Sequence, residues 1–369
     1  MSNTLLTPTL MAPDAGLILK DKLVVANLVN RSAEKKFVTK KGDTVNVYVP
    51  VAGAAEEFSL TTNAVDVTET AVEVVMQKHF DYRIDLTSDQ LSMEMDDFNT
   101  RIQIPAITAL IKLVEPYLLG KVVGGFSRNM SGTAGTDPTT HAHIIAAEKT
   151  IFDNYGDTSQ LVSVLGSTPW ASFKALNIMN SLDFREDGPS ALKTMELGQT
   201  NNISFFRSVH SGTFDFGDWD DSSTTATTLT TSTSVTIASL AEATGTIPEG
   251  VRFAIAGVTG TFTVTKDATI ASNAATVVVD STPDAAVSTA ACTSATAHTE
   301  NVVYDPNAVA AAILPGAPGP NAAIASIDGM GLRIIQSNIS TSTLAQSWVW
   351  DLYVGCKVVQ SASGCILQG

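Results

Sequence analysis

Cysteine, charge and long apolar runs are all scarce in this sequence, and each shortage excludes a class of protein. The three cysteines, Cys292, Cys356 and Cys365, are odd in number and show no C-x-x-C spacing. They predict neither a disulfide framework nor a zinc ribbon, and they suit a reducing cytoplasm. No run of about 20 apolar residues could span a bilayer. The opening MSNTLLTPTLMAPDAG lacks the charged and apolar regions of a signal peptide. We therefore expect a soluble protein of the cytoplasm.

Positive charge is especially scarce. The chain has 22 Lys and Arg against 37 Asp and Glu, which gives a net charge of −15 at pH 7. Proteins that coat nucleic acid carry basic faces, because neutralised phosphates drive their affinity. An acidic chain can still enclose DNA if its inner surface does not need to bind it tightly. Its 369 residues, 44% of them hydrophobic, are enough to bury the cores of two or three domains.

Catalytic and metal-binding motifs are missing as well. Nothing matches G-x-S-x-G, the phosphate-binding P-loop or H-E-x-x-H. His141 and His143 lie two residues apart in a predicted helix, so their side chains point apart and cannot share a metal. The run Asp215–Asp221 contains the triplet DFG, but the other kinase motifs and the calcium-loop spacing are absent. We interpret this run as a solvated acidic linker and expect no enzyme activity, no metal and no cofactor.

The N-terminal region is predicted to be extended. Its first 30 residues indicate an arm with one short helix that can bury little of itself. Alternating valines at 45, 47 and 49 predict one strand, and alternation from about Thr68 to Asp85 predicts another that is longer than most. The two strands form a hairpin. Because an isolated two-stranded arm is marginally stable in water, we expect arm and hairpin to lie against a neighbouring molecule.

A long apolar helix is predicted from Asp97 to Val123, where apolar residues recur every three or four positions with charged residues such as Glu115 between them. Pro105 should kink or restart this helix, because an interior proline removes a hydrogen bond. Asp137 and Pro138 have the residue types of the cap and first position of a second helix.

An alternating strand-and-helix pattern follows. The apolar strand Leu161–Leu165 precedes a helix that is expected to be capped at Ser167 or Thr168, with Pro169 at its first position. This order predicts an α+β body.

The composition changes at about Ser222. From there to about His298 the chain consists largely of Thr, Ala, Ser and Val in short alternating segments separated by Gly and Asn. This pattern predicts an inserted small β-barrel or β-sandwich. The apolar stretches from Trp348 onward predict strands that return to the body.

One cluster of basic residues is conspicuous in so acidic a chain. A solvated basic face is the usual meaning of such a run. Its place where the arm meets the hairpin favours instead a contact with an acidic neighbouring subunit. The residues are Arg31, Lys35, Lys36, Lys40 and Lys41.

The order of these parts resembles the major capsid protein of tailed bacteriophages, with the Hong Kong 97-type fold. The inserted β domain resembles that of the coat-protein branch of the Salmonella phage P-twenty-two type. The local resemblance lies in four stretches: Asp96 to Ala106 (the start of the spine helix), Glu196–Gln199 with Ser204–Ser208, Gly250–Val258 in the insertion, and Asp351–Val359 in the C-terminal strand.

This resemblance implies an α+β fold and a structural role. Copies would form hexamers and pentamers of an icosahedral shell that encloses phage DNA in the virion and is assembled in the host cytoplasm. A scaffolding protein and a portal would be partners, with a decoration protein as a further candidate. The implied divisions are an N-terminal arm (1–35), a β-hairpin E-loop (36–85), a peripheral domain with the spine helix (86–155), a central A-domain in two parts (156–221 and 301–347), the inserted β domain (222–300) and C-terminal strands (348–369).

Three alternatives stay open. A cellular nanocompartment shell has the same fold and would enclose enzymes in place of a genome. A secreted β-rich adhesin or surface-layer protein would explain the Thr-rich insertion but requires a secretion signal. An uncharacterised enzyme is disfavoured because no acid, base and nucleophile set converges.

Overall fold

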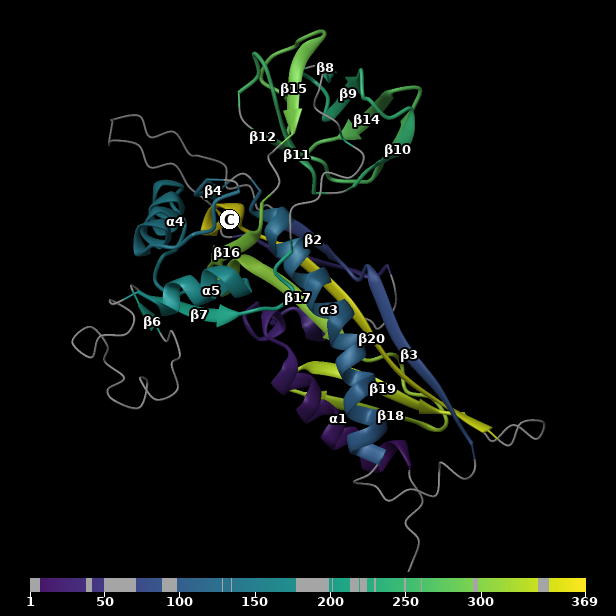
Figure 1. The fold of residues 1–369 in the computed structure, drawn as a ribbon. Coiled ribbons are helices and arrows are strands. Elements are labelled where there is room, and N and C mark those ends of the chain that lie inside the picture. Colours follow the sequence, from purple (N-terminus) through teal and green to yellow (C-terminus); the bar gives the residue numbers. More distant parts are fainter. Residues whose placement is uncertain are drawn as a thin grey trace, which may run out of the picture. The chain divides into compact units, whose positions relative to one another are not determined.

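The computed structural model of the chain is drawn in Figure 1. The chain has two compact units. The first comprises Met1–Lys121 and Pro306–Gln360, and the second Val122–Asp305 and Ser361–Gly369. The structure describes residues 7–37, 42–49, 71–87, 98–127, 129–133, 135–176, 199–200, 202–212, 219, 224–228, 230–248, 250–259, 261–294, 298–337 and 345–369.

The first unit is built on a five-stranded antiparallel sheet. The central strand β20 pairs with β17, β19 and β3, and β18 lies outside β19. Trp348 and Trp350 of β20 are fully buried, whereas the residue between them is half-buried, as alternation in a strand requires. The strands are β3 (Lys78–Thr87), β17 (Val309–Leu314), β18 (Ala322–Ile327), β19 (Met330–Gln336) and β20 (Ala345–Val358).

The N-terminal helix α1 (Pro8–Lys22) packs against β18 and β19 of this sheet. Met11, Ala15 and Leu19 recur every four residues and are buried, which places them on one face. The expectation that the arm buries little of itself is therefore wrong.

The long helix was predicted correctly in position. One π-helical turn, Asn99–Gln103, leads into α3 (Ile104–Gly125). The helical backbone continues through Ile104 (φ −60°, ψ −47°), so Pro105 stands where the π-helical turn passes into the α-helix. The predicted fresh start at Pro105 is not observed, and the helix changes its type there instead. Phe98 at the start of this element packs against Trp348, with ring centroids 5.2 Å apart.

The predicted long strand is in fact two strands. β2 (Ala71–Val75) pairs with β1 (Thr44–Tyr48), as a hairpin requires. The chain then leaves that pairing at Met76, which is fully buried, and continues as β3 along the whole of its length on β20. The second half of the predicted arm is therefore part of the body. The segment 50–70 between the hairpin strands lies outside the described residues.

The second unit contains a six-stranded mixed sheet in the order β4-β21-β16-β5-β7-β6. Every residue of β5 is buried, and β5 runs parallel to β7, which agrees with the predicted strand-and-helix body. The strands are β4 (Met130–Ser131), β5 (Leu161–Leu165), β6 (Gln199–Thr200), β7 (Ile203–Arg207), β16 (Glu300–Tyr304) and β21 (Gly364–Gln368).

Two helices described in this unit, α4 and α5, are capped at other residues than predicted. Helix α4 (His141–Asp153) is capped by Thr140, whose N–H donates to Nδ1 of His143 at 3.3 Å. Asp137 instead accepts a hydrogen bond from the hydroxyl of Thr299 at 3.2 Å. Helix α5 (Ser167–Lys174) is capped by Gly166, one residue earlier than expected.

The segment with the changed composition forms one eight-stranded antiparallel sheet, in the order β10-β13-β14-β9-β8-β15-β11-β12. A bridge between Val264, after β12, and Val279, after β14, links an edge of this sheet back to its middle. The predicted β segments are confirmed as strands. They are β8 (Thr225–Thr227), β9 (Ser234–Ala238), β10 (Thr244–Ile247), β11 (Arg252–Ile255), β12 (Thr261–Thr263), β13 (Ala268–Ala271), β14 (Ala274–Val278) and β15 (Ala290–Ser294).

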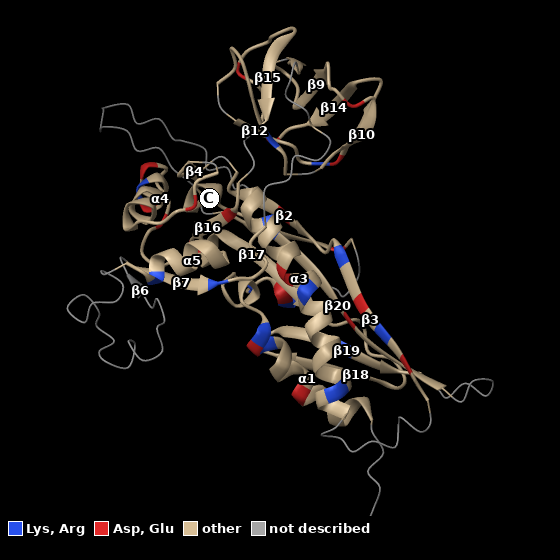
Figure 2. Ribbon diagram, in the orientation of Figure 1, with Lys and Arg blue, Asp and Glu red and all other residues tan. Residues whose placement is uncertain are grey.

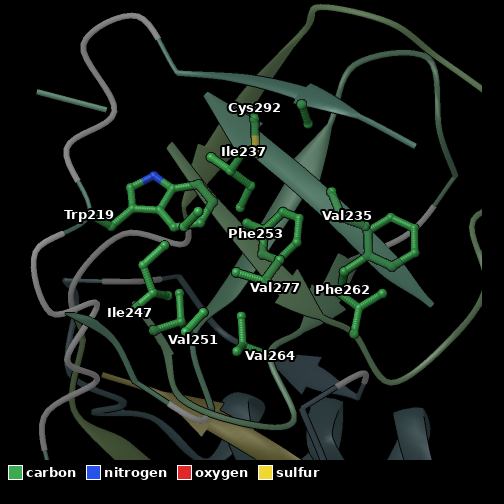
Figure 3. Close-up of a cluster of buried hydrophobic side chains, with 14 of the residues drawn as sticks. Trp219, Val235, Ile237, Ile247, Val251, Phe253, Phe262, Val264, Val277 and Cys292 are labelled. Atoms are coloured by element: carbon green, nitrogen blue, oxygen red, sulfur yellow. The ribbon is translucent and has the colours of Figure 1, made fainter. Parts of the chain in front are cut away.

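These strands enclose an apolar core of their own (Figure 3). Trp219 and Phe253 lie with ring centroids 5.2 Å apart, and Phe262 packs on the other side of Phe253 at 6.0 Å. Whether this segment folds independently remains a prediction.

Candidate assembly surface

The basic cluster lies on a short turn that is anchored by apolar residues. Lys35 and Lys36 form part of a 3-10 turn, Glu34–Lys36, and both are exposed. The flanking Ala33 and Phe37 are buried in a cluster with residues of β1, β2 and β17. This arrangement holds the two lysines at the surface. Lys40 and Lys41 lie outside the described residues.

Arg31 has a different environment from the two lysines. Its guanidinium donates to the carbonyl oxygen of Asp328 at 2.6 Å and lies 4.0 Å from the carboxylate of Glu34. Glu34 is buried and accepts a hydrogen bond from the N–H of Ile313 at 3.2 Å. Burial raises the pKa of Glu34, and the Ile313 bond and Arg31 oppose that rise. Arg31 therefore already has a role within the chain.

The turn that Arg31 contacts is a tight hairpin between β18 and β19. Asp328 and Gly329 have φ values of +51° and +89°, as expected for the two-residue Asp-Gly turn that joins paired strands. Lys20 of α1 forms an ion pair with Asp328. Two cations of the N-terminal segment thus hold one turn of the sheet.

A buried carboxylate, which the sequence pattern did not reveal, binds the N-terminal segment at a second place. Glu115 of α3 is 2% exposed, and its Oε1 accepts hydrogen bonds from the N–H groups of Val24 (2.6 Å) and Val25 (3.1 Å). Desolvation by burial raises the pKa of Glu115 to about 7. The helical pattern placed Glu115 between the apolar positions, and periodicity alone cannot show that another segment covers it.

A second polar network crosses the sheet of the first unit. Both oxygens of the buried Asp351 accept hydrogen bonds from Arg333, at 2.9 and 2.6 Å. Nε2 of His79 lies 2.8 Å from Oδ2 of Asp351, and the His79 ring stacks on Tyr353 with centroids 4.1 Å apart. The network joins β3, β20 and β19, so its geometry suits cross-strand stabilisation.

The residues considered for metal binding do not come together. His143 contacts Thr140, and no group of three or more His, Cys, Asp or Glu side chains forms a metal site among the described residues. Of the acidic run, only Trp219 lies within the described residues. Burial raises the pKa of Cys356 and of Cys365 to about 12, which suppresses thiolate formation. No helix in the described part of the chain is long and apolar enough to cross a membrane.

Charge is distributed unevenly over the described surface (Figure 2). Few charged residues lie on the strands β8 to β15, whereas β3 carries Lys78, Asp81, Arg83 and Asp85. The inserted strands thus offer few charged groups for contact, whereas β3 offers charges of both signs.

Comparison with known proteins gives matches in structure alone. The sequence matches no family model, and no curated protein matches it. The fold is similar to a chain from Mycobacterium phage Che8, with a TM-score of 0.52 and 12% identity over 94% of this chain and 91% of that one. It is also similar to a chain from the capsid structure of cyanophage P-SCSP1u, with a TM-score of 0.51 and 10% identity over 94% and 87%. The chain therefore has the mixed α+β fold of phage capsid proteins, as the sequence resemblance predicted.

Proposed function

We propose that this chain is the major capsid protein of a tailed bacteriophage and has no catalytic activity. Its copies assemble as hexamers and pentamers into the icosahedral shell that encloses the phage DNA. The observation that carries this proposal is coverage. The match to two phage structures extends over 94% of this chain and most of theirs, so it describes the whole molecule and not one module. The resemblance to the P-twenty-two branch, with its inserted domain, belongs to the same proposal.

The charge of the chain supports enclosure of DNA without tight binding. A net charge of −15 opposes tight binding of the chain as a whole to phosphates. The shell would be assembled in the host cytoplasm with a scaffolding protein and a portal, and a decoration protein is a further candidate partner.

The exposed lysines of the candidate assembly surface supply an intersubunit contact in this proposal. Lys35 and Lys36 project from an anchored turn, and Lys40 and Lys41 follow within five residues. These four would bind carboxylates of the adjacent subunit, and Arg31 would fix the turn that presents them. Each exposed pair contributes only about 0.2–1 kcal/mol, but a shell repeats every contact many times.

The test of function is assembly of the purified chain, with and without the neighbouring phage genes. Sedimentation and negative-stain microscopy should show rings or closed shells, and nuclease-protected DNA inside them would separate a virion shell from a cargo-bearing nanocompartment. A chain that stays monomeric under all of these conditions would contradict the proposal.

The lysine contact has a test of its own. Replacing Lys35, Lys36, Lys40 and Lys41 by Glu should lower shell yield without changing the thermal unfolding of the subunit. Wild-type yield should fall as salt rises, since charges are screened over roughly 10 Å at 0.1 M ionic strength. Lys112→Glu, on α3, is the matched control. Normal assembly of the quadruple variant would contradict the contact.

A further inference from the structure

One patch on the outer face of the inserted sheet is buried. In β11, Phe253 belongs to the apolar core of the insertion, so the alternation of a strand places Arg252 on the outer face. Arg252 is nevertheless 1% exposed, and Thr263, its partner on β12, is 5% exposed. Ala254, two residues further along the same face, is exposed. Another part of the chain therefore covers a small patch that contains Arg252 and Thr263.

The covering residues belong to the body of the second unit, which is the six-stranded sheet with its helices. Nη2 of Arg252 lies 3.0 Å from Nε2 of His298 and forms an ion pair with Glu300, the first residue of β16. The hydroxyl of Thr263 donates to that of Ser127, just after α3, at 2.6 Å. His298 and Ser127 are themselves buried. The contact between the inserted sheet and the body at this patch is thus polar.

The chain leaves the body and returns to it at one place, which is also at Glu300. The N–H of Glu300 donates to the carbonyl oxygen of Gly212 at 2.9 Å, and the hydroxyl of Ser211 donates to the carbonyl oxygen of Glu300. Ser211 and Gly212 lead toward the insertion, and residues 298–300 lead back from it. These two segments lie side by side and form a narrow neck.

The apolar core of the insertion does not include the body. All members of its cluster lie between Trp219 and Cys292. Polar interfaces between parts of one chain permit relative motion unless a specific contact prevents it. A neck of two segments leaves rotation about it open, so the contact of Arg252 decides whether the inserted sheet keeps one orientation.

Arg252 is suited to this role because its charge needs a partner at a fixed place. A guanidinium stays protonated in proteins, and its burial is tolerated when an opposite charge compensates it. Glu300 supplies that charge, and its side chain is 16% exposed. Removal of one member of a buried ion pair leaves the other uncompensated, which strongly destabilises the arrangement.

We propose that Arg252 fixes the inserted sheet in one orientation on the body of the second unit, with Thr263 as a second and weaker attachment. When the pair between Arg252 and Glu300 is broken, the inserted sheet turns about the neck without unfolding. This device belongs to the single subunit, so it goes beyond the shell function and its test does not require assembly.

The first experiment measures orientation as the distance between two spin labels in the full chain. The labels are attached at Val278→Cys, on the exposed face of β14, and at Ala146→Cys, on the exposed side of α4. The native cysteines are buried and should stay unlabelled. Dilution with unlabelled subunits restricts the signal to distances within one chain.

Wild type with these labels should give one narrow distance distribution. Arg252→Met keeps an apolar stem and removes the charge, so it should widen the distribution by roughly twofold or more. Lys266→Met is the matched control. It removes an exposed cation just after β12 and should leave the width unchanged. A width that Arg252→Met does not change, or a wild-type distribution as wide as that of the variant, would overturn the proposal.

The second experiment distinguishes turning from unfolding. In Arg252→Met, the amides of β9 and β14 in the middle of the inserted sheet should stay as protected from hydrogen exchange as in wild type. Loss of that protection would contradict the proposal, because Arg252 would then stabilise the sheet itself. Thr263→Val keeps the branched shape and removes the bond to Ser127, so it should widen the distance distribution less than Arg252→Met does. An equal or larger widening would contradict the ranking of the two attachments.

Discussion

The inserted sheet and the sheet of the first unit bury different kinds of side chain. The inserted strands enclose an almost wholly apolar cluster. Among the described residues of these strands, the buried charged side chain is Arg252, which pairs with Glu300 of β16. The first unit buries the Asp351 network and two carboxylates, Glu34 and Glu115. Apolar burial is non-directional, whereas a buried polar network specifies which groups must meet. The first unit joins segments distant in sequence, and its networks lie where those segments meet.

The outer face of the inserted sheet is polar through threonine side chains, with few charged residues. Exposed threonines pair across its strands, Thr246 with Thr269 and Thr236 with both Thr227 and Thr276. Threonine is β-branched and polar, so it favours the strand conformation and tolerates water on one face. The threonine-rich composition of this segment thus reflects the exposed face of its sheet.

The largest effect is expected from the apolar core of the insertion. Phe253→Ala should destabilise the unassembled subunit by about 3–5 kcal/mol, because it leaves a cavity between Trp219 and Phe262. Urea unfolding followed by fluorescence measures the loss. Val278→Ala, on the exposed face of β14, is the control and should change little. Equal effects of the two substitutions would mean that this core is not what stabilises the inserted sheet.

The first unit should respond to pH through Glu115. Its pKa is raised from 4.5 to about 7 in the folded state, so the stabilisation is complete below pH 4.5 and is lost as pH rises through 7. The loss amounts to about 3 kcal/mol. Hydrogen exchange of the amides of Val24 and Val25 should therefore quicken between pH 5 and pH 8, after correction for the intrinsic rate. Glu115→Gln should remove this dependence, and a wild-type profile that is already flat would contradict the assignment.

A smaller effect is expected from the cross-strand network. Asp351→Asn keeps the shape of the side chain but removes the charge that Arg333 and His79 share, at a cost of about 2 kcal/mol. Asp81, directly across from Asp351 on β3 and exposed, gives the matched control Asp81→Asn. Thermal unfolding and peptide-level exchange over β19 and β20 would measure both. Identical melting of the two variants would show that the network adds nothing to stability.

The smallest effect is expected on the threonine surface. Thr236→Val keeps the branched shape and removes one exposed hydroxyl, so the free energy of unfolding should stay within about 0.5 kcal/mol of wild type. A loss well above that, measured by the same urea titration, would mean that the paired hydroxyls stabilise the sheet.

Local patterns in the sequence predicted local structure well. The long helix and the inserted strands are confirmed, because periods of 3.6 and 2 residues need no knowledge of distant partners. The break at Met76 was missed, since β2 and β3 share one alternating pattern but pair with different strands. The cap of α4 was misplaced because Asp137 is bonded to Thr299, 162 residues away.

The candidate assembly surface was predicted in composition but not in its internal contacts. The basic residues stand close together in the sequence, and in the structure Lys35 and Lys36 are exposed. The sequence could not show that Arg31 reaches the carbonyl of Asp328, 297 residues away.

The strands β3 and β20, which pair with each other, are synthesised at very different times. Thr87 is opposite Ala345, and Lys78 is opposite Val354, so roughly 260–280 residues separate the partners. At the usual pace of about 5–20 residues per second, a ribosome needs on the order of 15–50 s to produce the second strand after the first. During that interval β3 has an unsatisfied edge, while the inserted sheet can complete all its pairings. Chaperone binding to the nascent chain should therefore begin near β3 and end when β20 emerges.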